Sequence, residues 1–165
     1  MQDVPSMLKN LKADSKAQWG SLSAPEMLDH LRRGIELSLK ENLEVEIITP
    51  SEQIPAFQEF LKGARLFKKG SDIPKEYSLI PKFEGDFEAR KINLLKALVK
   101  MQVHFEKHPD HMATHPNFGH LNVELWKYLH KKHILHHFTQ FGVCRILELH
   151  HCRGNIGIIC YGLSY

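Results

Sequence analysis

Apolar side chains recur at helical spacing in four separate stretches of the chain, and this pattern predicts four amphipathic helices. The first stretch covers about residues 5–18. The second begins at Ser23, because Ser23 and Glu26 have the spacing of a capping box. Its apolar stripe follows at i, i+4 and i+8 with Met27, Leu31 and Ile35. His30 lies beside this stripe, so we expect its ring to face the protein interior or to lie close to it.

The third and fourth stretches predict the two longest helices. Asp86 is the expected N-cap of the third helix, which extends to about residue 107. The fourth helix is predicted over about residues 122–141, and Gly142 follows it where a glycine commonly ends a helix. The apolar face of the third helix contains Phe87, Leu94, Leu98, Met101 and Phe105. The face of the fourth contains Trp126, Leu129 and Phe141.

The remaining segments show no dominant period. Residues 40–85 are interrupted by four prolines and predict a long insert with one short helix at about residues 56–66. The segment HPDHMATHPNFGHL contains two prolines and a glycine, which favours a connection over a regular element. No strand alternation is evident before the tail. The pattern therefore predicts an all-α four-helix bundle for residues 1–142 and a tail of unclear structure for residues 143–165.

Composition narrows the class of protein. The 165 residues suffice for one domain, and 42% hydrophobic and 25% charged residues are typical of globular proteins. A net charge of +3 without a clustered basic face argues against a nucleic-acid partner. No signal peptide and no apolar stretch of membrane-spanning length is apparent, so we expect a cytoplasmic protein. The three cysteines, all in the last part of the chain, have no spacing that indicates a disulfide framework.

Histidine is the unusual component: eleven of the twelve histidines lie between His104 and His151. In HKKHILHHFTQFG, His133 and His137 are one helical turn apart, so both rings can reach one point. They continue the apolar face of the fourth helix, which favours the interior. A hydrogen-bonded histidine pair without metal is the alternative. His30 adds a third inward-facing imidazole, and three histidines with an open coordination position are typical of a catalytic metal site.

The other histidines have less defined expectations. His130 lies one turn before His133 and could contact a ligand histidine, whereas His136 points to the side of the pair. Five more surround the connection after the third helix, either as a solvated loop or near the mouth of the site: His104, His108, His111, His115 and His120. A further Cys/His group in the tail would comprise His150, His151 and Cys152.

The segments SAPEMLDHL and HKKHILHHFTQFG resemble the DinB superfamily of bacterial four-helix bundles, which includes YfiT-like metal-dependent hydrolases and thiol-dependent S-transferases. The last helix of that superfamily reads H-x-x-H-H-x-x-Q. The resemblance covers about residues 10–142 and is closest to a branch known only as a domain of unknown function. It implies an up-down-down-up bundle and metal ligation by His30, His133 and His137, with Gln140 in the glutamine position.

Two functions follow as hypotheses. The first is a metal-dependent enzyme in which Zn²⁺, Ni²⁺ or Fe²⁺ activates water for hydrolysis, or stabilises the thiolate of a low-molecular-weight thiol for transfer to a small molecule. The resemblance favours thiol transfer, since the superfamily includes bacillithiol- and mycothiol-dependent transferases. The insert and the loop 108–120 would form the substrate rim, while Glu124, Asp29 and Tyr128 are candidate bases. The second is a non-catalytic metal-binding or stress-response bundle that acts through its surface. A homodimer is compatible with both hypotheses.

Overall fold

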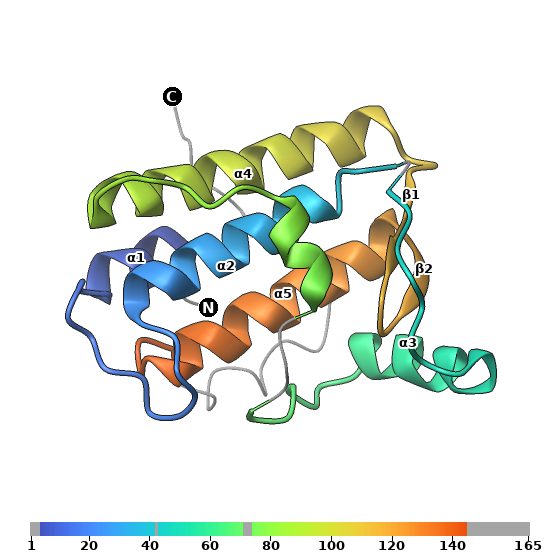
Figure 1. Ribbon diagram of the computed structural model, residues 1–165, viewed down its shortest axis with the longest axis horizontal. Helices are drawn as coiled ribbons and strands as arrows, with labels where there is room; N and C mark the ends of the chain where they lie inside the picture. Colours follow the sequence, from blue (N-terminus) through green and yellow to red (C-terminus); the bar gives the residue numbers. More distant parts are fainter. Residues whose placement is uncertain (1–3, 42, 71–73, 145–165) are drawn as a thin grey trace.

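Three long helices form the body of the protein. The computed structural model describes residues 4–41, 43–70 and 74–144. The long helices are α2 (Ala24–Leu37), α4 (Phe87–Lys107) and α5 (Val123–Gln140). Helix α2 lies between α4 and α5 and contacts both (Figure 1). The first and last long helices of the chain are therefore neighbours, and this contact positions the candidate site.

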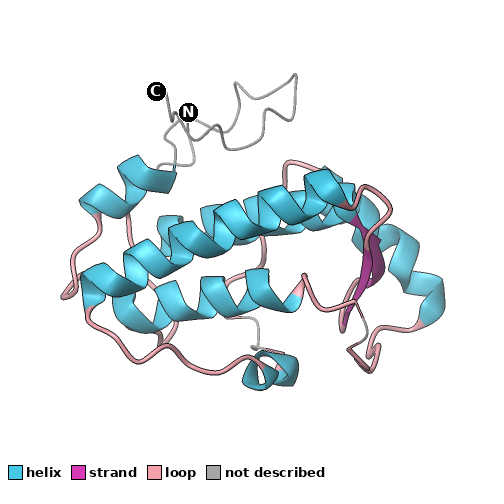
Figure 2. Cartoon of the chain, turned by 90° about the horizontal axis from the view of Figure 1, so that it is seen from above, coloured by secondary structure: helices cyan, strands magenta, loops and turns pink. Residues whose placement is uncertain are grey.

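Short elements occupy the two ends of this body. Helix α1 (Val4–Asn10) lies at one end, and the strands β1 (Met112–His115) and β2 (Gly119–Asn122) lie at the other (Figures 1 and 2). The insert contains the 3₁₀ helix η1 (Ser51–Gln53), helix α3 (Ile54–Lys62) and the 3₁₀ helix η2 (Lys75–Leu79). Helix α3 packs on α5, and η2 packs on α2.

Local capping contacts explain where the long helices begin, as the sequence predicts. The Ser23 hydroxyl accepts a hydrogen bond from the Glu26 amide, and the Glu26 carboxylate accepts one from the Ser23 amide at 2.8 Å. Asp86 caps α4 through its carboxylate, and the side-chain oxygen of Asn122 accepts from the amide of Leu125 at 3.0 Å. Each cap satisfies backbone donors that have no partner within the helix.

The predicted all-α, up-down-down-up four-helix bundle is wrong. The structure combines five α-helices with a two-stranded antiparallel sheet within the described residues. Helix α1 ends at Asn10, although the sequence predicts helix to about residue 18. The Ser15 hydroxyl accepts from the Lys12 amide at 3.0 Å, and the Ser15 amide donates to the Lys12 carbonyl at 3.1 Å. This local turn competes with the helix, so no fourth long helix forms.

The second difference is the β1–β2 hairpin, which replaces the predicted irregular connection. His115 pairs with Gly119 across the turn, and Gly119 adopts a φ of 69°, which an L side chain rarely adopts. Ala113, His115 and Leu121 are buried and face the helices, while their neighbours are more exposed. The alternation is real but covers only four residues in each strand, and one of its inward positions is a histidine.

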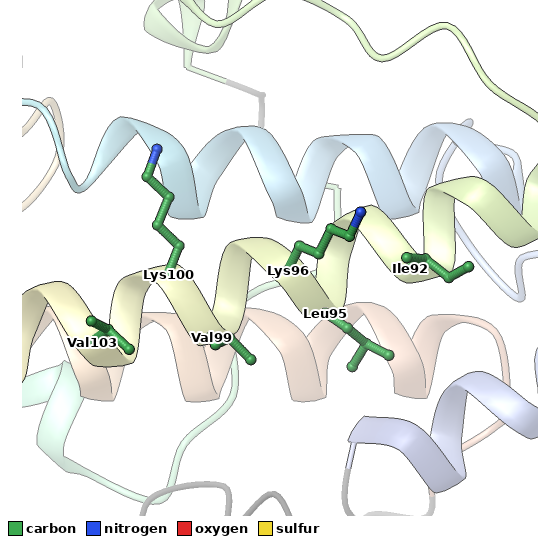
Figure 3. A pocket seen from close by; sticks show the side chains of 6 residues that line it. All are labelled: Ile92, Leu95, Lys96, Val99, Lys100 and Val103. Atoms are coloured by element: carbon green, nitrogen blue, oxygen red, sulfur yellow. The ribbon is translucent and has the colours of Figure 1, made fainter.

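Three apolar clusters hold the described elements together, and the smallest of them, formed by Leu37, Tyr77 and Ile80, joins η2 to the end of α2. The largest joins α1, α2, α4 and the second half of α5, and the second joins α3, the hairpin, the end of α4 and the start of α5. The outer face of α4 carries exposed apolar residues instead, among them Ile92, Val99 and Val103 (Figure 3). In the part of the chain that the structure describes, no helix combines the length and apolarity needed to cross a bilayer.

Candidate metal centre

Helices α2 and α5 bring three imidazoles together at one point. Nε2 of His133 lies 2.8 Å from Nε2 of His30 and 3.0 Å from Nε2 of His137. The rings of His30 and His137 are 4.7 Å apart between centroids. His30 and His137 are buried, and His133 is partly exposed. The three residues predicted from the sequence are thus neighbours, and each directs Nε2 towards the others.

A hydrogen bond from His137 to Gln140 fixes the orientation of the His137 ring. The Nδ1–H of His137 donates to the side-chain oxygen of Gln140 at 2.8 Å, and the amide nitrogen of Gln140 donates to the carbonyl of Trp19 at 2.5 Å. In the neutral ring, a proton on Nδ1 leaves Nε2 with its lone pair. Metal-binding histidines commonly have such a partner on the second ring nitrogen.

The 3₁₀ helix η2 covers His30. The Tyr77 ring stacks on the His30 ring with centroids 4.8 Å apart and an angle of 16° between the planes. Arg33 donates to the carbonyls of Tyr77 and Ile80, which ties η2 to α2. Gly34 leaves room for this contact, because a Cβ at this position would lie 2.5 Å from the Tyr77 hydroxyl oxygen. Tyr77 therefore limits the directions in which the His30 ring can turn.

Burial keeps the three imidazoles uncharged. It is the largest cause of a lowered pKa in each ring, and it lowers the pKa of His30 to about 3 and that of His137 to about 4 from an ordinary value of 6.5. The pKa of His133 is also well below its ordinary value because of burial and of the neighbouring His137 and His30. Neutral imidazole is the form that binds metal ions.

A proton can serve the three ring nitrogens only if two of them share it. Since Nε2 of His137 carries a lone pair, the proton on His133 Nε2 would have to donate to it. His30, 2.8 Å away on the other side, would then have to share the same proton through its own lone pair. A cation between the rings would satisfy three lone pairs at once. Two nitrogens bound to one tetrahedral ion at about 2.1 Å lie about 3.4 Å apart, so small outward ring movements give that geometry.

The flanking histidines of α5 have other partners. His130 is buried, stacks on Trp126 and contacts the Ser38 hydroxyl oxygen through Nε2 at 2.9 Å. It therefore supports the packing of α5 on α2 and makes no contact with the three rings through this nitrogen. His136 is half-buried, and its ring lies edge-on to Trp19. It borders the site from the side, as its helical position predicts.

None of the three candidate bases has a position that supports that role. Asp29 is buried, but its Oδ1 accepts hydrogen bonds from the Arg32 guanidinium at 2.8 and 2.9 Å and from the Phe83 amide at 3.2 Å. Glu124 is exposed in the first turn of α5, more than two turns before His133. Tyr128 packs against the apolar cluster that joins α3, the hairpin and the start of α5. The general base stays unassigned.

The five histidines near the hairpin are expected from the sequence either in a solvated loop or near the mouth of the site, and as a group they fit neither. His111 and His115 are buried, whereas His108 and His120 are exposed. Nε2 of His111 contacts the carbonyl of Ser38 at 2.8 Å. Ser38 caps the C-terminus of α2, about 12 Å along the helix from His30. The loop 108–120 thus packs at the far end of α2.

The insert does supply residues next to the three imidazoles. The rings of Phe67 and His133 are 6.3 Å apart between centroids, and those of Tyr77 and His133 are 6.5 Å apart. Lys132 holds the segment around Phe67, because its ammonium group donates to the carbonyls of Gly63 at 2.7 Å and Arg65 at 2.5 Å. The sequence identifies the insert as a rim but gives no signal for these two aromatic residues. The tail group of His150, His151 and Cys152 lies outside the described residues.

Comparison with known proteins places the chain in one family. Residues 2–143 match the family described as protein of unknown function (DUF1569). No curated protein matches the chain, and no solved structure matches it. The family match covers the helices, the hairpin and all three imidazoles. The chain therefore belongs to the DUF1569 family of proteins of unknown function.

Proposed function

We propose that the protein is a metal-dependent enzyme that binds a divalent ion through His30, His133 and His137. The observation that carries this proposal is the convergence of three Nε2 atoms from α2 and α5, two of them within 3.0 Å of the third. A set of three neutral imidazoles is suited to Zn²⁺, Ni²⁺ or Fe²⁺. Such a set leaves coordination positions for a substrate, as in catalytic metal sites.

We infer a thiol-dependent transfer, or a hydrolysis, of a small molecule as the reaction. The pattern H-x-x-H-H-x-x-Q at His133–Gln140 and the position of His30 support a relationship to the DinB superfamily, whose members include thiol-dependent S-transferases. A divalent ion at this site would supply Lewis acidity, towards either a thiol or water. The protein would bind it through neutral rings that release few protons at pH 7, because burial has already lowered their pKa values.

Residues of the insert would bind and orient the substrate. Phe67 and Tyr77 flank His133, the most exposed of the three histidines, so a substrate would approach on this side. Their apolar rings would exclude water from part of the site, which strengthens electrostatic interactions there. Gln140 would hold His137 in the ligand tautomer, and Tyr77 would hold the plane of the His30 ring.

A non-catalytic metal-binding protein is the second candidate. One observation favours it: the group of His30, His133 and His137 includes no carboxylate, and the buried Asp29 is already paired with Arg32. An enzyme of this type would then need its base from the substrate or from a thiol cosubstrate. A metal-binding protein that acts through its surface needs no base.

Two measurements separate these functions. Metal analysis of the untagged protein should find an ion that is lost in His133→Ala, with His136→Ala as a matched control on the same helix. Metal content that His133→Ala leaves unchanged would refute the ligand assignment. The metal-loaded protein is then tested with a series of low-molecular-weight thiols and a chromogenic electrophile, and with chromogenic esters. Turnover that requires both metal and His133 supports the enzyme, whereas metal binding without turnover supports the second candidate.

A further inference from the structure

A second group of side chains with potential metal ligands lies at the C-terminal end of α2. It shares no residue with the group of His30, His133 and His137. It consists of Glu41 after α2, His104 in the last turn of α4 and His111 before β1. Nδ1 of His111 lies 3.1 Å from Oε1 of Glu41 and 3.1 Å from Nε2 of His104. The distance from His104 Nε2 to the same Glu41 oxygen is 3.8 Å.

The backbone of α2 fixes the state of the His111 ring. Nε2 of His111 lies 2.8 Å from the carbonyl oxygen of Ser38, which can only accept a hydrogen bond, so Nε2 carries a proton. In the neutral ring, Nδ1 then directs its lone pair towards the carboxylate of Glu41. This is the arrangement in which a backbone carbonyl orients a metal-binding histidine through its second nitrogen. The His111 side chain is 0% exposed, so water cannot rearrange around it.

One proton serves the whole group only if two acceptors share it. If Nδ1 of His111 is also protonated, its single N–H is shared between the Glu41 oxygen and the lone pair of His104 Nε2, each 3.1 Å away, and a fully buried ring becomes a cation. If His104 donates to a neutral His111, the lone pair of His111 and the Glu41 oxygen face each other. A divalent ion between the three atoms satisfies all of them. Their separations of 3.1 to 3.8 Å bracket the about 3.4 Å expected for ligands of one tetrahedral ion.

We propose that Glu41, His104 and His111 form a second site for a divalent transition-metal ion. Two imidazoles and one carboxylate are a ligand set suited to Zn²⁺ or Co²⁺, and the half-exposed Glu41 leaves the remaining coordination open to solvent on its side. The ion would link the segment after α2 to the end of α4 and to the hairpin. This proposal does not depend on the function proposed for His30, His133 and His137.

Zn²⁺ titration of the untagged full chain by calorimetry tests the second site. We expect His104→Ala to bind one ion fewer than the wild type, and Glu41→Gln to weaken that same ion by at least tenfold. Both residues are partly exposed, so these variants should fold. The matched control His120→Ala removes an exposed hairpin histidine and should leave the number of ions unchanged. The readout is the difference between variants, because the chain carries other histidines and cysteines.

The experiment tests the two site assignments independently of each other. If His104→Ala and Glu41→Gln bind Zn²⁺ as the wild type does, the second site does not exist, whatever His133→Ala shows. If only His133→Ala leaves binding unchanged, the first assignment fails and the second stands. Co²⁺ gives an independent measurement in a background without the first site: His133→Ala should still show visible absorption bands, and adding His104→Ala to it should abolish them. Bands that persist in His104→Ala within the His133→Ala background would overturn the proposal.

Discussion

Replacing Gln140 with leucine tests whether the hydrogen bond to His137 prepares that ring to bind metal. The substitution removes an acceptor 2.8 Å from Nδ1 of His137 while keeping a side chain of similar size in a buried position. Without the acceptor, His137 is free to place its proton on Nε2 and to turn its ring. Loss of such a partner typically costs 10- to 100-fold in metal affinity, or about 1.4 to 2.7 kcal/mol.

Gln140 also donates to the carbonyl of Trp19, so a glutamate at this position separates the two roles. Gln140→Glu keeps an oxygen for the Nδ1–H of His137, and a carboxylate accepts that bond more strongly than an amide. On the other side it places an oxygen against the Trp19 carbonyl, which repels it. We expect Gln140→Glu to retain the metal affinity of the wild type but to unfold at a lower temperature. Gln140→Leu should lower both.

Competition between the protein and a chromogenic Zn²⁺ chelator gives the affinities, and thermal unfolding of the metal-free variants gives the stabilities. Gln18→Leu is the matched control, because Gln18 is an exposed glutamine in the segment next to Trp19. It should change the affinity by less than twofold. The orienting role of Gln140 is refuted if Gln140→Leu binds Zn²⁺ within twofold of the wild type, or if both Gln140 variants lose affinity equally.

Three further substitutions test the surroundings of the site. Burial lowers the pKa of His115 to about 3, so on acidification this histidine is protonated in the unfolded chain before it is protonated in the folded protein. The folded state should therefore be most stable against this effect above about pH 6.5, and its free energy of unfolding should fall as the pH drops towards 3. His115→Phe should reduce the change in unfolding free energy with pH by up to about 1.4 kcal/mol per pH unit, as measured by urea unfolding at several pH values. An unchanged pH dependence would contradict this. Lys132→Met removes the donor to the carbonyls of Gly63 and Arg65, so it should lower the free energy of unfolding in urea by about 2 kcal/mol. It should also speed proteolysis near Phe67, and cleavage at the wild-type rate would contradict the anchoring role of Lys132. Gly34→Ala places a Cβ against Tyr77 and should cost about 1 to 3 kcal/mol in thermal unfolding, whereas an unchanged Tm would show that Tyr77 moves freely.

The features that the sequence predicts correctly are local ones. The capping spacing of Ser23 and Glu26 and the cap at Asp86 determine helix starts through contacts three residues apart. The helical repeat likewise orders side chains on one face, so Met27 and Leu31 are buried as expected. The one-turn spacing of His133 and His137 is a local feature of the same kind, because it depends only on the helix that carries both residues. These contacts need no knowledge of the rest of the fold.

The features that the sequence misses depend on distant partners or on short segments. The end of α1 depends on a turn in which Ser15 competes with the helix, and nothing in the apolar pattern reports it. The hairpin has too few residues to show its period, and its inward His115 looks polar until Phe118 and Trp126 surround it. The stacking of Tyr77 on His30 joins two segments with no common pattern. The third imidazole could be expected from its helical face, but its distance from the other two could not.

The pairing of His30 with His133 joins positions 103 residues apart. The described elements from η1 to the hairpin lie between them, so this contact closes a long loop of chain. Contacts of such sequence separation form late, because closing a long loop costs entropy before any contact repays it. The rings of His133 and His137 are one turn apart on α5, so they can come together as soon as that helix forms. The complete triad would therefore assemble late in folding, and chains in which α2 has not yet met α5 would offer an ion only two ligands of this site.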